Sequence, residues 1–222
     1  MILNFIRAGN IYIKIALIFF LTFLFQSNLI AEKSQCQSEL QKKGLIFAPS
    51  NELGTVDAVL VTPPVNSILI QHWPHKDGRQ PLLMDCRIAD ALFRIAPALK
   101  KLGITQIIGA RSYHYRCIAP AKNPPYCTGT SLSLHASAMA IDIGGFIDRE
   151  GVKYWFIHDW LLDPQEQATC DKKLSGKNGF LHEAVCEIYK TGVFSQHLTP
   201  NYNEAHKSHL HLDLSTQERF IR

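Results

Sequence analysis

The sequence predicts an α+β fold, in which a small, mostly antiparallel sheet is flanked by helices. Short strand-like segments and two separate amphipathic helical segments occur along the chain, without the regular alternation of strand and helix that a doubly wound sheet requires. The part of the chain that carries them has about 190 residues, which suits one domain with its own hydrophobic core.

The N-terminus is typical of a secretory signal peptide. Arg7 and Lys14 precede an apolar run over residues 15–25, and a polar stretch follows it. The run is shorter than the roughly 20 residues that a membrane-spanning helix needs, so an uncleaved anchor is the weaker alternative. We interpret residues 1–31 as a signal peptide and residues 32–222 as an exported domain, periplasmic or extracellular, with no stable membrane span after cleavage.

The charge of the chain is weak. The formal net charge is +4, from 23 basic and 19 acidic residues, and removing Arg7 and Lys14 with the leader leaves about +2. The chain contains no basic run. We therefore expect no nucleic-acid partner.

The six cysteines all follow the leader, and an even number suits an oxidising compartment. A cysteine-ligated zinc site is the alternative, but the sequence contains no CxxC pair. Proximity along the chain favours two pairs and leaves the remaining two cysteines for each other: Cys117 with Cys127, Cys170 with Cys186, and Cys36 with Cys86.

In the first half of the domain we expect a short lead-in, three strands, a loop and a helix. The lead-in covers residues 36–55, the strands 56–61, 67–71 and 104–108, and the loop 72–80. Apolar residues recur at helical spacing over residues 88–102, and Gly103 follows as a C-cap. Pro97 is expected to kink this helix or to split it in two.

In the second half we expect an irregular loop over residues 117–129, a strand over 138–146, a helix over 180–188 that ends at Gly192, and a last strand over 209–214. The Gly144–Gly145 pair suggests a bulge or a close backbone approach.

The last strand alternates strictly between polar residues and leucines. The period of two places His209, His211 and Asp213 on one face, and the leucines must face a core. The polar face is either solvated or gathered around a metal, for which two imidazoles on a stiff strand are well placed. Asp213 is either a partner that orients a ligand imidazole or a plain strand-end carboxylate.

A second cluster supports the metal interpretation. His135 and Asp142 lie seven residues apart with mostly small residues between them, which suits a loop entering a strand with little bulk around a metal. Zinc accepts imidazole nitrogen and carboxylate oxygen, and a catalytic site needs three protein ligands and a water. His135, Asp142 and His211 supply that set.

Two motifs together resemble a known family. They are S-x-H-x-x-A-x-A-x-D over residues 133–142 and A-H-x-x-H-x-H-x-D-L over residues 205–214. Both are similar to motifs of the extensin-like C-terminal domain family of bacterial exported proteins. That family is in turn similar to zinc peptidases that include D-alanyl-D-alanine carboxypeptidases, penicillin-insensitive murein endopeptidase and the hedgehog signalling domain. The resemblance implies a hedgehog/D,D-peptidase-like fold with a zinc site in a groove on the sheet.

The resemblance also implies roles for individual residues. His135, Asp142 and His211 match the zinc ligands of the wider peptidase group. His209 matches a histidine that acts as general base or stabilises the transition state, and His206 matches an accessory histidine. Carboxypeptidases of the group have a glutamate where this chain has Ser208, so the endopeptidase-like arrangement is favoured.

An arginine ahead of the first ligand is typical of the group and would hold a substrate carboxylate or carbonyl oxygen. Arg116 fits the spacing after Ser112-Tyr113 and Arg111 fits a G-x-R-S pattern, with Arg116 slightly preferred. Leu134 stands where glutamate is common in the group. The function implied is hydrolysis of peptide bonds in peptidoglycan by a zinc-dependent amidase or peptidase. The alternative is a non-catalytic, zinc-containing envelope-binding or structural module.

The remaining histidines are isolated in the sequence, and we expect them to be surface or structural residues: His72, His75, His114, His158, His182 and His197. Three tryptophans belong either to the core or to a groove: Trp73, Trp155 and Trp160.

Overall fold

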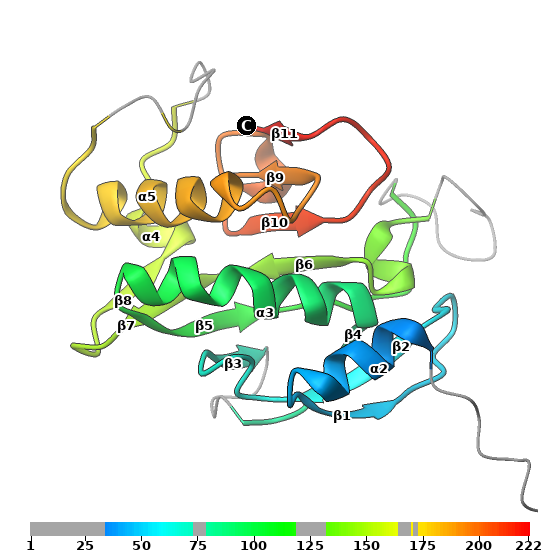
Figure 1. Ribbon diagram of the computed structural model, residues 1–222. Helices are drawn as coiled ribbons and strands as arrows, with labels where there is room; N and C mark the ends of the chain where they lie inside the picture. The colour runs from blue at the N-terminus through cyan, green and yellow to red at the C-terminus, as the bar shows by residue number, and fades with distance from the viewer. Residues whose placement is uncertain (1–33, 73–78, 119–131, 164–169, 171–172) are drawn as a thin grey trace, which may run out of the picture. The chain divides into compact units, whose positions relative to one another are not determined.

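The computed structural model describes residues 34–72, 79–118, 132–163, 170 and 173–222 (Figure 1). Gln35–Arg222 form one compact unit. Among the described residues, no helix has the length and apolar character needed to cross a bilayer. The signal peptide expected over residues 1–31 lies outside the described residues.

The described strands form three small sheets, where the sequence predicted one. The first contains β1 (Ile46–Pro49), β2 (Ala58–Thr62) and β4 (Leu82–Asp85) in that order. The second has the order β3 (Leu69–His72), β5 (Ile104–Ala110), β7 (Gly145–Asp148) and β8 (Lys153–Trp155). The third has the order β11 (Phe220–Ile221), β9 (Gln196–Leu198), β10 (Leu210–Asp213) and β6 (Ala140–Ile143). Most pairs are antiparallel, so the α+β class with mostly antiparallel strands is confirmed.

Four α-helices and two short 3-10 helices are described beside the sheets. The α-helices are α2 (Gln35–Lys42), α3 (Cys86–Lys101), α4 (Phe156–Asp159) and α5 (Gly176–Lys190). The 3-10 helices are η2 (Leu134–Ser137) and η3 (Glu204–His206). The lead-in expected over residues 36–55 was wrong in one respect, because α2 and β1 form within it.

Helix α3 packs at the centre of the domain, against α2, α5 and β5 (Figure 1). Its apolar residues at helical spacing, such as Ile88, Ile95 and Leu99, are fully buried. Each such side chain contributes about 1.5–3 kcal/mol through its removal from water. Together with buried residues of β5 and β10 they form one hydrophobic core.

Pro97 lies inside α3 and does not split it, so that alternative was wrong. Proline lacks the N–H that would bond the carbonyl four residues earlier. In this chain the Asn66 side-chain amide donates to that carbonyl, Phe93 O, at 3.0 Å. The Phe93 carbonyl therefore accepts a hydrogen bond from outside the helix, and the helix continues to Lys101.

The strand expected over residues 138–146 is two strands that separate at Gly144. Strand β6 pairs with β10 in the third sheet, whereas β7 pairs with β5 and β8 in the second. A Cβ added at Gly144 would lie 3.2 Å from Ile108 O and 3.3 Å from Gly109 Cα. The predicted close backbone approach is confirmed, and it lets the chain pass from one sheet to the other.

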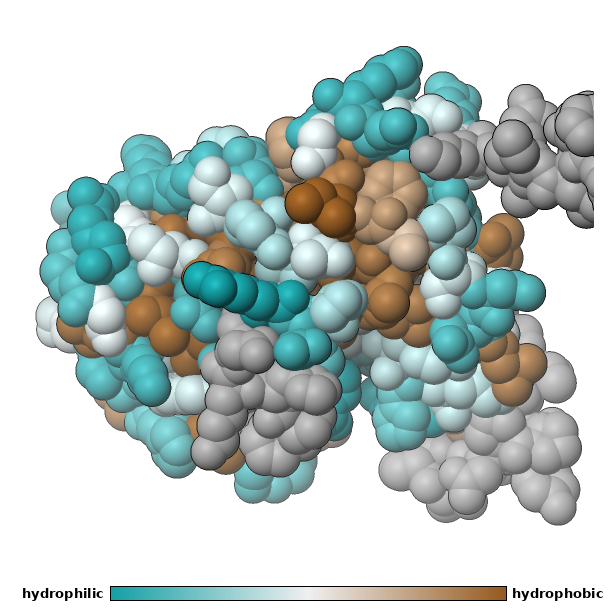
Figure 2. Space-filling view, turned by 90° about the horizontal axis from the view of Figure 1, so that it is seen from below, coloured by the Kyte–Doolittle hydropathy of each residue, from teal (hydrophilic) through white to brown (hydrophobic). Residues whose placement is uncertain are grey.

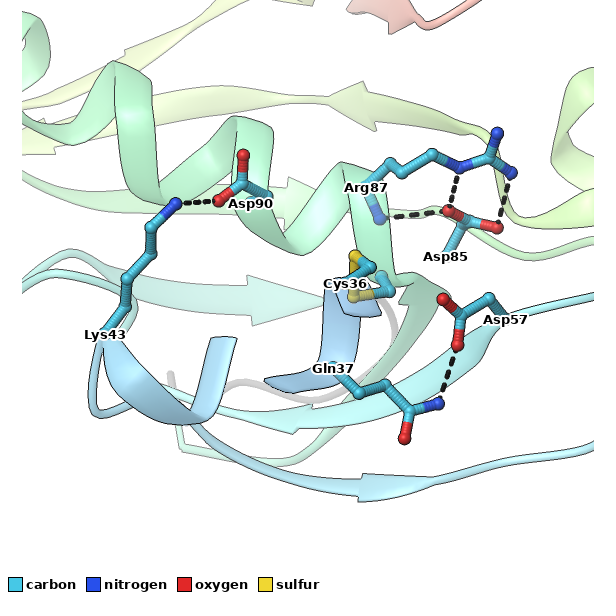
Figure 3. The surroundings of a disulfide bond; sticks show 8 residues. Cys36, Gln37, Lys43, Asp57, Asp85, Arg87 and Asp90 are labelled. Carbon is cyan, nitrogen blue, oxygen red and sulfur yellow. Dashed lines mark hydrogen bonds and ion pairs between the residues drawn. A yellow bond between two sulfur atoms is a disulfide. The ribbon is translucent and has the colours of Figure 1, made fainter. Parts of the chain in front are cut away.

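Two of the expected disulfides are confirmed: Cys36–Cys86 and Cys170–Cys186. Cys117 is also disulfide-bonded, but Cys127 lies outside the described residues. Figure 3 shows how Cys36–Cys86 joins α2 to the first residue of α3.

The junction between β4 and α3 is held by Asp85, which is buried and caps the helix (Figure 3). Asp85 Oδ1 accepts from Arg87 N at 2.9 Å, and the Arg87 guanidinium bonds both carboxylate oxygens at 2.7 and 3.0 Å. An N-cap carboxylate satisfies a backbone N–H that the first turn leaves without a partner.

Several large apolar side chains of the N-terminal part are exposed, among them Ile46, Leu53 and Val56. Figure 2 shows one face of the molecule, on which apolar side chains gather between polar ones. Apolar atoms on a protein surface are normal and do not by themselves indicate a binding site.

Candidate metal centre

Strand β10 carries His211 and Asp213 into the interior. It lies between β9 and β6, and all four of its residues are buried. Leu210 and Leu212 belong to the hydrophobic core, as the alternation predicted. His211 is 9% exposed and Asp213 5%, so the solvated alternative for this face is wrong.

Asp142 and His135 meet His211 from two other elements. Asp142 lies on β6, directly opposite His211 in the antiparallel register. His135 lies in η2, whose N-cap Ser133 accepts a hydrogen bond from the His135 backbone N–H. The residues between His135 and Asp142 are mostly small, as noted from the sequence. They allow the chain to turn from η2 into β6 at Ala138, which has a left-handed conformation with φ of 57°.

Three potential ligand atoms converge at this point. His135 Nε2 lies 3.2 Å from Asp142 Oδ1 and 3.2 Å from His211 Nδ1. His211 Nδ1 lies 2.9 Å from Asp142 Oδ1. Ligand atoms about 2.0–2.1 Å from a tetrahedral zinc ion lie about 3.3 Å from one another, so this triangle has the size of a zinc site.

The other ring nitrogens of the two histidines fix which nitrogen faces the centre. His135 Nδ1–H donates to the Ser112 carbonyl at 2.8 Å, and His211 Nε2–H donates to Asp213 Oδ2 at 3.2 Å. In their neutral forms, His135 Nε2 and His211 Nδ1 are therefore acceptors. Together with the Asp142 carboxylate they form three acceptors that face one another without a donor, an arrangement that a cation stabilises.

A second group of potential metal ligands among the described residues consists of Cys36, Asp57 and Cys86. Its two cysteines are joined in a disulfide, so they offer no thiolate to a metal.

The pKa values of the cluster reflect this convergence. Burial raises the pKa of Asp142, but the contacts of its carboxylate with the His135 and His211 imidazoles outweigh burial and hold that pKa well below its usual range. Burial lowers the pKa of His211, but the hydrogen bonds to Asp142 and Asp213 outweigh this and raise it to about 9. Without a metal, a proton on His211 therefore holds the cluster together near neutral pH.

Two further histidines border the centre. His209 Nε2 lies 3.4 Å from Asp142 Oδ1, and its Nδ1 lies 3.2 Å from Ser208 Oγ. The His206 ring lies 5.3 Å from that of His209, and His206 Nδ1–H donates to Asn203 Oδ1 at 2.7 Å. Burial lowers the pKa of His209 and brings that of His206 to about 4. Both imidazoles are then neutral near pH 7 and able to accept a proton.

Both candidate arginines lie near the cluster. Arg111 exchanges two backbone hydrogen bonds with Asp142, at 3.0 and 2.7 Å. Residues paired in this way project their side chains from the same face, so the Arg111 side chain starts beside the Asp142 carboxylate. Arg116 lies further along the same segment, and the two arginines line one cleft.

This cleft has a volume of about 1020 Å³ and opens beside Asp142, His211, His209 and His206. Among the described residues that line it, Asp142 is the sole carboxylate, whereas two arginines and four histidines are present. Trp155, Ile157 and Leu198 supply apolar lining. The cleft therefore suits a ligand that combines apolar parts with a negative charge or a polarised oxygen.

The fourth of these histidines is His114, which sequence reasoning missed. It was expected to be a surface or structural residue and is exposed, but it also lines the cleft. Partial burial, together with Arg116 and Arg111, lowers its pKa. Its position between the two candidate arginines was the signal that could have found it.

Most of the other aromatic and histidine candidates lie away from the cleft. Trp160 is buried and stacks on His182 with ring centroids 3.7 Å apart, and His197 is buried in β9. Of the two tryptophans that the structure describes, Trp155 is the one that lines the cleft. Trp73 and His75 lie outside the described residues.

The protein is thus an α+β domain with an electropositive cleft. Two histidines and an aspartate that could bind a metal ion converge beside this cleft. Residues 34–222 match the family model described as Extensin-like protein C-terminus. The chain therefore belongs to the extensin-like C-terminal family, as its two motifs predicted. No curated protein and no solved structure matches it.

Proposed function

We propose that this protein is an exported, zinc-dependent peptidase that hydrolyses peptide bonds in peptidoglycan, with an endopeptidase-like arrangement of residues. The observation that supports it is the convergence of His135 Nε2, Asp142 Oδ1 and His211 Nδ1, which are three acceptors whenever both histidines are neutral.

The donor set fits zinc. His135 Nε2, Asp142 Oδ1 and His211 Nδ1 would hold the ion, since they are two imidazoles and a carboxylate at mutual distances of 2.9–3.2 Å. The chemistry that zinc supplies when bound by three such ligands is activation of a water molecule near neutral pH and polarisation of a carbonyl group.

His209 is the candidate general base. It is neutral near pH 7 because burial lowers its pKa, and its Nε2 points to the same carboxylate oxygen that the ligand histidines share. A neutral imidazole at this distance can take a proton from an attacking water and return it to the leaving amine. Arg111 and Arg116 would hold a substrate carboxylate or a developing oxyanion.

Three further observations support a peptidoglycan substrate. The motifs are similar to those of murein peptidases, and Ser208 replaces the glutamate of the carboxypeptidases. The two described disulfides suit an exported protein, which would meet the cell wall. The electropositive cleft suits wall peptides, which carry carboxylates.

The proposal is tested by digestion of muropeptides with zinc-replete protein. We expect His209→Ala to keep its zinc and its fold but to lower hydrolysis by roughly 10² to 10⁴, the usual contribution of a positioned acid–base group. His158→Ala is the matched control, because His158 is an exposed histidine of α4 outside the cleft.

Hydrolysis by His209→Ala at the wild-type rate would show that the assigned mechanism is wrong. If the wild type binds cell wall without hydrolysing it, and His209→Ala binds the wall with the same affinity, the protein is instead a non-catalytic envelope module.

A further inference from the structure

One short segment, residues 111–114, contacts two of the three proposed ligands. The Arg111 backbone exchanges two hydrogen bonds with the Asp142 backbone. The Ser112 carbonyl accepts from His135 Nδ1 at 2.8 Å, and the His114 N–H donates to His135 O at 3.0 Å. The position of this segment therefore determines how His135 and Asp142 face each other.

The side chain of Ser112 anchors that segment. It is 1% exposed, and its hydroxyl donates a hydrogen bond to the Leu83 carbonyl in β4. Strand β4 also contacts the C-cap residue of η2, because Asp85 N–H donates to Ala138 O at 3.0 Å. Asp85 is in turn held by Arg87 at the start of α3 (Figure 3).

Ser112 thus lies where all three sheets meet. Leu83 belongs to β4 of the first sheet. Strand β5 of the second sheet ends at Ala110, Arg111 follows as a bridge residue paired with Asp142, and Ser112 comes next. Asp142 belongs to β6 of the third sheet.

We propose that Ser112 is a positioning residue of the metal centre, whose hydroxyl fixes the His135 ring and the Asp142 backbone through the link to β4. The inference rests on the proposed zinc site. The groups that orient a ligand imidazole commonly change metal affinity by about 10–100-fold when they are lost. Removing the hydroxyl leaves the Ser112 carbonyl in the chain but frees the segment that carries it.

The experiment measures the zinc dissociation constant of the whole chain by competition with a chelating dye, together with melting temperatures of the metal-free and zinc-loaded forms. We expect Ser112→Ala to weaken zinc binding by about 10–100-fold. Thr105→Val is the matched control, because the Thr105 hydroxyl also bonds backbone carbonyls, those of Ile147 and Asp148, at the far end of β5. It should leave zinc affinity unchanged.

The outcomes are distinct. A wild-type chain that binds no zinc overturns the proposed function itself. If the wild type and Ser112→Ala bind zinc equally well, the inference is wrong. Equal lowering of the melting temperatures of the metal-free and zinc-loaded variant would then show that Ser112 is merely structural.

A measurement on the wild type covers the case in which Ser112→Ala does not fold. Coupling between the hydroxyl link and the metal is reciprocal at equilibrium, so bound zinc should lower the population in which this hydrogen bond is open. Exchange of the Ser112 hydroxyl proton, which occurs from that open population, should then slow on the order of tenfold, as measured by NMR. An unchanged exchange rate in the zinc-bound wild type overturns the inference.

Discussion

At the scale of single residues, His211 is the proposed ligand at which a proton and zinc would compete. Its Nε2–H is held by Asp213, and its Nδ1 faces Asp142 and His135. The raised pKa of about 9 describes the metal-free protein. A proton on His211 stabilises the fold fully below the ordinary pKa of about 6.5, and that stabilisation is lost as the pH rises through about 9.

We therefore predict that zinc binding at pH 7.5 releases about one proton from His211, since a ligand nitrogen must be unprotonated. Zinc affinity should rise with pH up to about 9 and then level off. Calorimetry in two buffers of different protonation enthalpy measures the proton count. Zinc binding at pH 7.5 with no proton release would contradict the assignment of His211 Nδ1 as a ligand.

The three proposed ligand residues could be named from the sequence, whereas the hydrogen-bond partners of their side chains could be named only in part. Spacing and motif pointed to His135, Asp142 and His211, because zinc chemistry restricts the residue types. Asp213 was weighed as an orienting partner and is one. The partner of His135 is a backbone carbonyl, that of Ser112, and every residue type offers such a group.

At the scale of elements, periodicity predicted the core helix and the last strand because a buried face leaves a repeating pattern. The periodicity of residues 138–146 did not reveal that this segment contributes strands to two different sheets. Nothing in the hydrophobic pattern of residues 138–146 separates β6 from β7, and the separation depends on the tertiary contact of Gly144 with Gly109. The helix α2 was missed because only Gln37 and Leu40 are buried on it.

The disulfide that joins α2 to α3 supports a prediction at this scale. Cys36 and Cys86 are 50 residues apart, whereas Cys170 and Cys186 are 16 apart. Loop-closure entropy then gives a stabilisation of about 4 kcal/mol for the first bond and about 3 kcal/mol for the second. Paired alanine substitutions followed by denaturant unfolding measure both losses. A larger loss for the Cys170–Cys186 pair would contradict this ordering.

At the scale of the whole molecule, the candidate metal centre depends on long-range strand pairing. His211 meets Asp142 because β10 pairs with β6, and these strands are separated by more than sixty residues that include α5. The sequence predicted mixed helices and strands and one small sheet, but not the three sheets, since short strands carry no local signal for their partners. The site forms where segments attached to all three sheets converge.

Zinc binding at this convergence of His135, Asp142 and His211 can be measured by elemental analysis of the whole chain purified without added metal. We predict close to one zinc per chain in the wild type and in His209→Ala, and loss of the metal in His211→Ala, because of these two histidines only His211 is a proposed ligand. Zinc added to the metal-free wild type should also raise its melting temperature, since a ligand that binds the folded state stabilises it. A wild-type protein without zinc, whose melting temperature does not respond to added zinc, would contradict the proposed zinc site.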